Sequence, residues 1–136
     1  MPGIDQVLAQ AMGIPGVLGA GLVDWTSGLT LGTAGRAPHA DHEAAAADTA
    51  EVVQAVVRNA TFDTTGTNGS DGTNGSDGPD LEDLIITAAG SYHLIRFVHT
   101  AFDSQTYLYL WLDRGQANLA IARLRLRDLA AELVAA

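Results

Sequence analysis

The residues at positions 106–113, TYLYLWLD, constrain the fold more than any other stretch of this sequence. Successive side chains of a β-strand point to opposite faces, so Tyr107, Tyr109 and Trp111 would share one face and leucines would share the other. Both faces are apolar, and neither is suited to water. Such a strand is expected near the centre of a sheet that helices cover on both sides.

The rest of the sequence supplies partners for this central strand. Apolar runs that end at turn residues predict four further strands, at 17–24, 29–35, 81–89 and 92–99. Apolar residues at helical spacing predict three helices, at 3–12, 39–62 and 115–136. We therefore predict an α+β fold (an α/β sandwich) in the order α-β-β-α-β-β-β-α, with a five-stranded antiparallel sheet and helices on both faces.

One six-residue unit occurs twice at positions 67–78, as TNGSDGTNGSDG, between the middle helix and the third strand. It contains no apolar side chain. An EF-hand calcium loop places its ligands at alternate positions and ends on a Glu, and the aspartates here do not follow that pattern. Neither flank closes a core by itself, so we predict a single domain over 1–136 with a Gly/Asn/Ser/Asp-rich loop insert at 63–80.

The composition excludes several classes of function. Cysteine and lysine are both absent, which removes thiolate nucleophiles and Schiff-base chemistry. The net charge of −9 argues against nucleic acid and against anionic membranes. No apolar run approaches the roughly 20 residues of a membrane span, and the first residues do not resemble a signal peptide. We expect a soluble, cytoplasmic protein, bacterial by its Ala- and Gly-rich composition, without a cofactor.

Two histidines at the start of the middle helix raise the question of a metal site. His39, His42 and Glu43 combine imidazole with carboxylate, as zinc sites do. However, HADHEAAA lacks the second histidine of the H-E-x-x-H motif, because position 46 is Ala. The spacing therefore favours a solvated helix start over a metal or catalytic site, and a histidine metalloenzyme is kept only as a competing hypothesis.

Three stretches of this chain resemble the Roadblock family, which is named for a dynein light chain. They are GVLGAGLVDWTSGLTLGTAG at 16–35, LEDLIITAAGSYHLIRFV at 81–98 and LYLWLDRGQANLAIARLRLRDLAAEL at 108–133, within which ANLAIAR is the most specific piece. The resemblance implies a profilin-like sandwich that forms a homodimer. Family members bind Ras-like small GTPases or act as adaptors beside them. Some bacterial relatives stimulate GTP hydrolysis without donating a catalytic residue.

The resemblance also implies where partners bind. In this family the middle helix packs against its mate, and the third strand pairs edge to edge with its mate. Valines on more than one side of the middle helix suit a helix that faces both the sheet and a partner. The interface residues expected on this basis are Ala45, Thr49, Val52, Val53, Val56, Leu84 and Ile86.

Two further features leave alternatives open. Trp25 lies where the first hairpin turns, so it is either a partner anchor or a lid over the end of the core. The aromatic face of 106–113 could instead line a pocket, which would make the protein a small-ligand sensor. The hypothesis that the resemblance favours is a non-enzymatic homodimer that regulates or scaffolds a small Ras-like GTPase in bacterial signalling.

Overall fold

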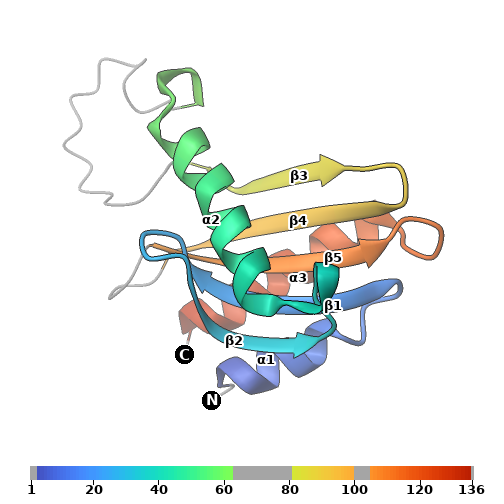
Figure 1. The fold of residues 1–136 in the computed structure, drawn as a ribbon. Helices are drawn as coiled ribbons and strands as arrows, with labels where there is room; N and C mark the ends of the chain where they lie inside the picture. The colour runs from blue at the N-terminus through green and yellow to red at the C-terminus, as the bar shows by residue number, and fades with distance from the viewer. Residues whose placement is uncertain (1–2, 63–80, 100–104, 136) are drawn as a thin grey trace.

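The structure is a computed structural model that describes residues 3–62, 81–99 and 105–135. Within these residues one antiparallel sheet has the strand order β2-β1-β5-β4-β3. Its strands are β1 (Val17–Asp24), β2 (Leu29–Gly35), β3 (Asp83–Thr87), β4 (Ser91–Val98) and β5 (Thr106–Asp113). The helices are α1 (Ile4–Ala11), α2 (His42–Arg58) and α3 (Leu119–Ala135), with 3-10 turns η1 (Pro38–Ala40) and η2 (Ala60–Phe62). The predicted fold class and order of helices and strands are confirmed (Figure 1).

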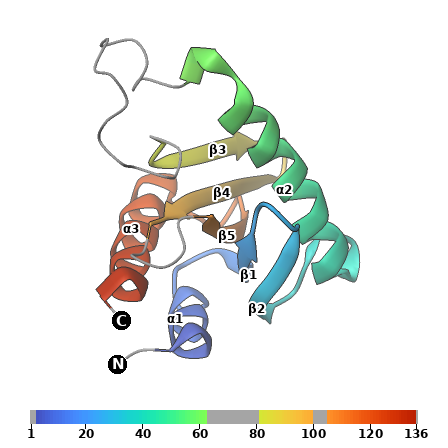
Figure 2. The ribbon, with the colours of Figure 1, turned by 90° about the vertical axis from the view of Figure 1, so that its left-hand side faces the viewer.

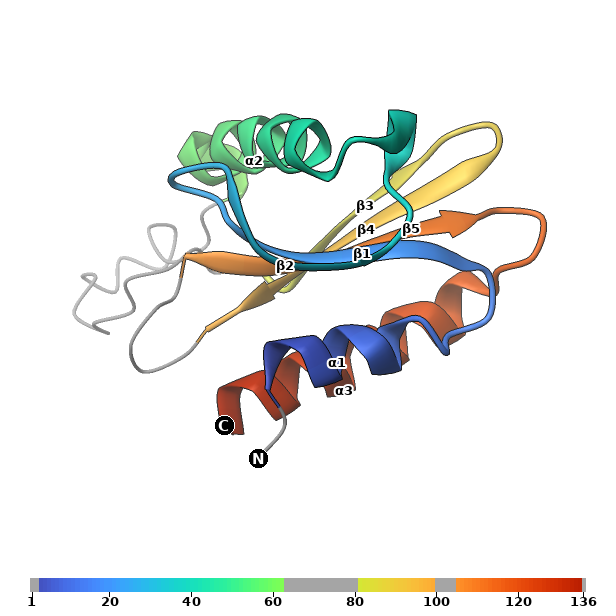
Figure 3. The same cartoon turned by 60° about the horizontal axis from the view of Figure 1, so that its bottom comes forward.

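The sheet separates two layers of helices. Helix α2 covers one face, and α1 and α3 cover the other (Figure 3). Strand β5 lies in the middle, between β1 and β4, as its two apolar faces predicted. Its leucines join the core beneath α1 and α3, and Tyr107 and Tyr109 join the core beneath α2. Because burying a large apolar side chain contributes about 1.5–3 kcal/mol, β5 is a main source of stability for both layers.

The middle helix is shorter than the predicted span of 39–62. It begins at His42, because Asp41 has an extended backbone and its carboxylate accepts a hydrogen bond from the Ala44 N–H at 3.0 Å. His39, two residues before Asp41, has a left-handed backbone, with φ of 56°, which does not fit a right-handed α-helix. The helix ends at Arg58, since Asn59 leaves the helical region with ψ of 120°.

Other boundaries also differ from prediction. Helix α3 starts later than position 115 because the Asn118 side chain accepts from the Ile121 N–H at 3.1 Å and caps the helix. Strand β3 is shorter than 81–89 at both ends. The predicted loop insert at 63–80, with the repeat at 67–78, lies outside the described residues. None of the described helices is both long and apolar enough to cross a membrane.

Two glycines of β1 show how closely the backbone packs. A Cβ added at Gly19 would collide with the carbonyl of Arg36, which follows β2. A Cβ added at Gly21 would meet the Gly32 carbonyl oxygen at 3.5 Å, which is an ordinary contact. Both lie in the same strand, so they form a matched pair for mutation.

We expect Gly19→Ala to lower the free energy of unfolding by about 3 kcal/mol, because backbone rather than a flexible side chain must move. Gly21→Ala should change it by less than about 1 kcal/mol. Urea unfolding followed by tryptophan fluorescence measures both. Equal losses from the two substitutions would contradict the close approach at Gly19.

Candidate functional site

Helix α2 presents different residues to the sheet and to its flank. Ala46, Ala50 and Val53 are buried against the sheet. Val53 is fully buried, so it packs within the core of this chain although the sequence placed it among the interface residues. The neighbouring stripe follows the helical period and contains Ala45, Thr49, Val52 and Val56. Val52 is 41% exposed and belongs to neither core cluster of the described residues.

Strand β3 places its predicted interface residues on the α2 side of the sheet. Leu84 pairs with Ile95 and packs with the tyrosine cluster beneath α2. Ile86 is two residues further along, so it shares that face, and it is 39% exposed. Figure 2 shows α2 on one face of the sheet, and Leu84 and Ile86 of β3 lie on that same face.

The two edges of the sheet differ in their suitability for pairing. The edge strand β2 pairs with β1 through a register shift next to Leu22, and such a bulge disturbs an edge. Strand β3 pairs with β4 in unbroken register and has no neighbour on its other side within the described sheet. Asp83 at its start is held by Arg123 of α3, Nε to Oδ2 at 2.5 Å. The β3 edge is thus regular and fixed in place.

A partly buried hydroxyl pair links α2 to the sheet. The Thr49 Oγ1 lies 3.2 Å from the Ala46 carbonyl oxygen and 2.5 Å from the Tyr107 hydroxyl. A threonine hydroxyl has one proton, so when it donates to the carbonyl the tyrosine donates to Thr49. Burial raises the pKa of Tyr107 to about 12, and the Thr49 hydrogen bond offsets part of that rise. Thr49 therefore faces partly inward, and its contribution to an external interface stays a prediction.

Polar side chains of β4 and β5 form a second hydrogen-bonded link, which joins these two strands. The His93 imidazole stacks on the Tyr109 ring, with Nδ1 at 2.8 Å from the tyrosine hydroxyl. Its Nε2 lies 3.1 Å from the Ser91 hydroxyl. Burial lowers the pKa of His93, which favours the neutral imidazole. Because both ring nitrogens are engaged, this chain of hydrogen bonds ties the two strands together.

Trp25 is half-buried at the end of β1. Its ring packs against the core beneath α2, and its carbonyl oxygen accepts from the Gln54 side chain at 2.6 Å. The indole N–H is buried and has no hydrogen-bond partner within the described residues. This placement fits a lid over the core, and a partner could reach the indole N–H only if the ring moved.

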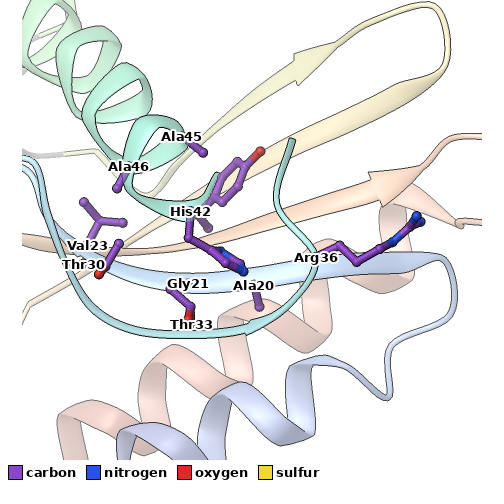
Figure 4. Close-up of a pocket in the computed structure, with 10 residues that line it drawn as sticks. Ala20, Gly21, Val23, Thr30, Thr33, Arg36, His42, Ala45 and Ala46 are labelled. Atoms are coloured by element: carbon purple, nitrogen blue, oxygen red, sulfur yellow. The ribbon is translucent and has the colours of Figure 1, made fainter. Parts of the chain in front are cut away.

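Two hollows lie where the connection after β2 meets α2. The sequence raised a pocket along the aromatic face of β5, from which Tyr109 lines the smaller hollow and Trp111 the larger, but it did not predict the other lining residues. The smaller, about 10 Å³, lies between β1, β2 and the start of α2, which is room for about one water molecule. Figure 4 shows His42 reaching over the strands beside it. The larger is an open cleft of about 450 Å³, whose walls include Arg36, His39, His42 and Trp111. Trp111 comes from β5, so no local pattern in the sequence could have joined it to the others.

Helix α2 covers most of the aromatic face of β5. Tyr107 is fully buried and Tyr109 nearly so, because α2 packs on them. Trp111 lies at the edge of this packing and borders the cleft. The histidines predicted as a competing metal site border the same cleft. In the described part of the chain, no three His, Asp or Glu side chains come close enough together to hold a metal ion.

No protein-family model matches the sequence, and no curated protein matches it either. Several solved structures do match the fold. Myxococcus xanthus MglB superposes with a TM-score of 0.67 at 20% identity, over 96% of this chain and 81% of that one. The Roadblock/LC7 domain from Streptomyces avermitilis superposes with a TM-score of 0.62 at 15% identity, over 96% of this chain and 93% of that one. The gliding protein MglB from Thermus thermophilus superposes with a TM-score of 0.67 at 16% identity, over 96% of this chain and 87% of that one.

This chain has the Roadblock/LC7 fold. The match covers nearly all of this chain and most of each similar structure, so it includes both helical layers and the whole sheet. The Roadblock fold that the sequence resemblance implied is thereby confirmed. Within that fold, α2 and β3 are the elements in which the predicted interface residues lie.

The Thr49–Tyr107 pair can be tested through stability. Thr49→Val keeps the shape of the side chain but leaves the buried Tyr107 hydroxyl without its partner, so it should lower the free energy of unfolding by about 1–3 kcal/mol. Thr49→Ser retains the hydroxyl and should cost less than half as much. Thermal and urea unfolding measure both variants, and equal losses would show that the hydroxyl pair does not hold the helix.

The raised pKa of Tyr107 predicts alkaline destabilisation. The unfolded chain releases this proton near pH 10, whereas the folded chain holds it to about pH 12. The unfolded state therefore binds fewer protons between these values, and stability falls as pH rises. The raised pKa contributes about 2–3 kcal/mol to the free energy of unfolding. This contribution is fully present below pH 10 and should be lost as the pH rises through 12.

Urea unfolding at a series of alkaline pH values measures this slope. Tyr107→Phe lacks the ionisable group, so its stability should fall less steeply over the same range. A remaining slope is expected from Tyr109, whose pKa burial also raises. Identical slopes for wild type and Tyr107→Phe would contradict the assignment.

Proposed function

We propose that this protein is a homodimeric regulator or scaffold of a small Ras-like GTPase in bacterial signalling, and that it acts by binding rather than by catalysis. The observation that carries the proposal is the nearness of two surfaces. Helix α2 has exposed apolar residues, and β3, whose interface residues lie on the same face of the sheet as α2, is a regular edge strand of the described sheet. We place it in the cytoplasm, as a single Roadblock-like domain whose insert at 63–80 connects α2 to β3.

Two features support self-association. Val52 and Ile86 are large apolar side chains that gain by burial, and β3 carries unpaired backbone groups along its outer edge in the described sheet. A second copy related by a two-fold axis would satisfy both at once, because the same surface meets itself. One similar structure is described as MglB with a tetrameric arrangement, with a TM-score of 0.68 at 16% identity over 96% of this chain and 84% of that one.

One line of support concerns the GTPase partner, and a second concerns binding rather than catalysis. Roadblock family members, which the sequence resembles, bind Ras-like small GTPases, and the similar structures include MglB proteins and MglC from Myxococcus xanthus. The side chains of Ser91 and His93 are engaged in the hydrogen-bonded link between β4 and β5, which is a structural role. This arrangement fits a protein that acts through its surface.

The dimer is tested by placing charge on the proposed interface. Wild-type protein should have a mass of about twice 14.1 kDa by light scattering. Val52→Asp combined with Ile86→Asp should return it to the mass of one chain, because buried unpaired carboxylates are costly. The matched control is Leu124→Asp, on the exposed side of α3, where the leucine is 51% exposed. A wild-type monomer at micromolar concentration, or dissociation by the control alone, would exclude this interface.

The GTPase partner is tested by retention on immobilised protein. A Ras-like GTPase from the source organism should be retained when loaded with GDP or with a non-hydrolysable GTP analogue. If Trp25 anchors the partner, Trp25→Ala should weaken retention by about tenfold or more. Phe62→Ala removes another exposed aromatic ring and serves as the control. Absence of retention in both nucleotide states would refute the GTPase proposal.

A further inference from the structure

The cleft beside α2 is a different kind of surface from the proposed interface. It is about 450 Å³ in volume, a size typical of small-molecule sites, and it lies where η1 and the end of β2 approach β5. Its polar walls are Arg36, His39 and His42, and Trp111 forms an aromatic wall. The described residues that line it include no carboxylate. Arg36 carries the formal positive charge of this lining, in a chain of net charge −9.

Arg36 is an exposed arginine whose side chain lies over an aromatic ring. Its guanidinium carbon lies 5.8 Å from the centre of the Trp111 ring, which is a cation–π contact. Within the described residues it forms no ion pair. Other arginines contrast with it: Arg123 and Arg96 approach Asp83, and Arg127 approaches Asp128. The Trp111 ring leaves the donor groups of Arg36 available to an oxyanion.

The backbone at η1 is strained in the way that functional sites often are. His39 and Ala40 both have positive φ, 56° and 59°, and each non-glycine residue in this region is energetically unfavourable. The strained turn sets the His39 side chain on the wall of the cleft. His42 fixes the opposite end of the turn, because its Nε2 donates to the Gly35 carbonyl at 3.0 Å.

We propose that this cleft binds a small soluble phosphorylated molecule, with the phosphoryl group held by Arg36 and His39 and the remainder of the molecule beside Trp111. Arginine forms paired charge-assisted hydrogen bonds with phosphate oxygens, and an imidazole N–H adds a donor from a different direction. Arg36 and His39 border the same cleft, so both can donate to one phosphoryl group, whose three terminal oxygens offer more acceptors than the two of a carboxylate. His42 is a positioning residue that maintains the shape of the wall.

Isothermal titration of the full-length protein in a phosphate-free buffer tests the site with phenyl phosphate as probe. We expect binding that shifts tryptophan fluorescence, because Trp111 lies under Arg36. Phenol has the same ring without the phosphoryl group and should bind at least about tenfold more weakly. Benzoate, which carries a carboxylate, should also bind more weakly.

Three variants locate the binding. Arg36→Gln should weaken phenyl phosphate binding by about tenfold. His39→Gly removes the imidazole but adopts a positive φ without strain, so it should fold as well as wild type and bind about threefold more weakly. Arg58→Gln changes an exposed arginine at the far end of α2 and should leave affinity unchanged.

Defined outcomes would overturn the proposal. They are an absence of binding up to millimolar phenyl phosphate, equal binding of phenol, equal binding of benzoate, and unchanged affinity in Arg36→Gln. Vesicles of phosphatidylcholine containing phosphatidic acid test whether the phosphoryl group belongs to a lipid rather than to a soluble molecule. Sedimentation with these vesicles, without binding of soluble phenyl phosphate, would overturn the assignment of a soluble ligand.

Discussion

The burial of β5 on both faces is the constraint on which the rest of this structure depends. Its leucines require α1 and α3 on one side, and its tyrosines require α2 on the other. A strand so placed needs a hydrogen-bonded neighbour at each edge, which β1 and β4 provide. These in turn leave β2 and β3 as the outer strands. The open β3 edge is therefore a consequence of satisfying β5.

The small residues of α2 explain how one helix can serve both a core and an outer surface. Ala46 and Ala50 let the helix approach the sheet closely, and Val53 is its main apolar contribution to that contact. The helix is positioned further by the Thr49–Tyr107 hydroxyl pair and by Gln54 bonding to the Trp25 carbonyl. With these links made inside the chain, Val52 is not needed for the core and stays exposed.

The sequence predicted those features that depend on local periodicity. The bounds of β1, β2 and β5 follow from their apolar runs and turns, and the two-sided pattern of β5 predicted its central place. The start of α2 was missed because the Asp41 cap and the left-handed backbone at His39 override a continuous helical pattern. The pattern also could not separate Val52 from Val53, since only the orientation of the helix on the sheet decides which one is buried.

The full set of residues that line the cleft could not be predicted, because they come from distant parts of the chain. Its lining residues come from the end of β2 and the connection after it, from η1, from the start of α2 and from β5, and β1 lies between β2 and β5 in the sheet. Arg36 and His42 border both this cleft and the small hollow beneath the first turn of α2, where Ala45 also lies. Ala45 belongs to the predicted interface stripe. A group bound at Arg36 therefore lies next to the end of α2 at which that stripe begins, so the polar cleft and the apolar surface are adjacent but chemically separate.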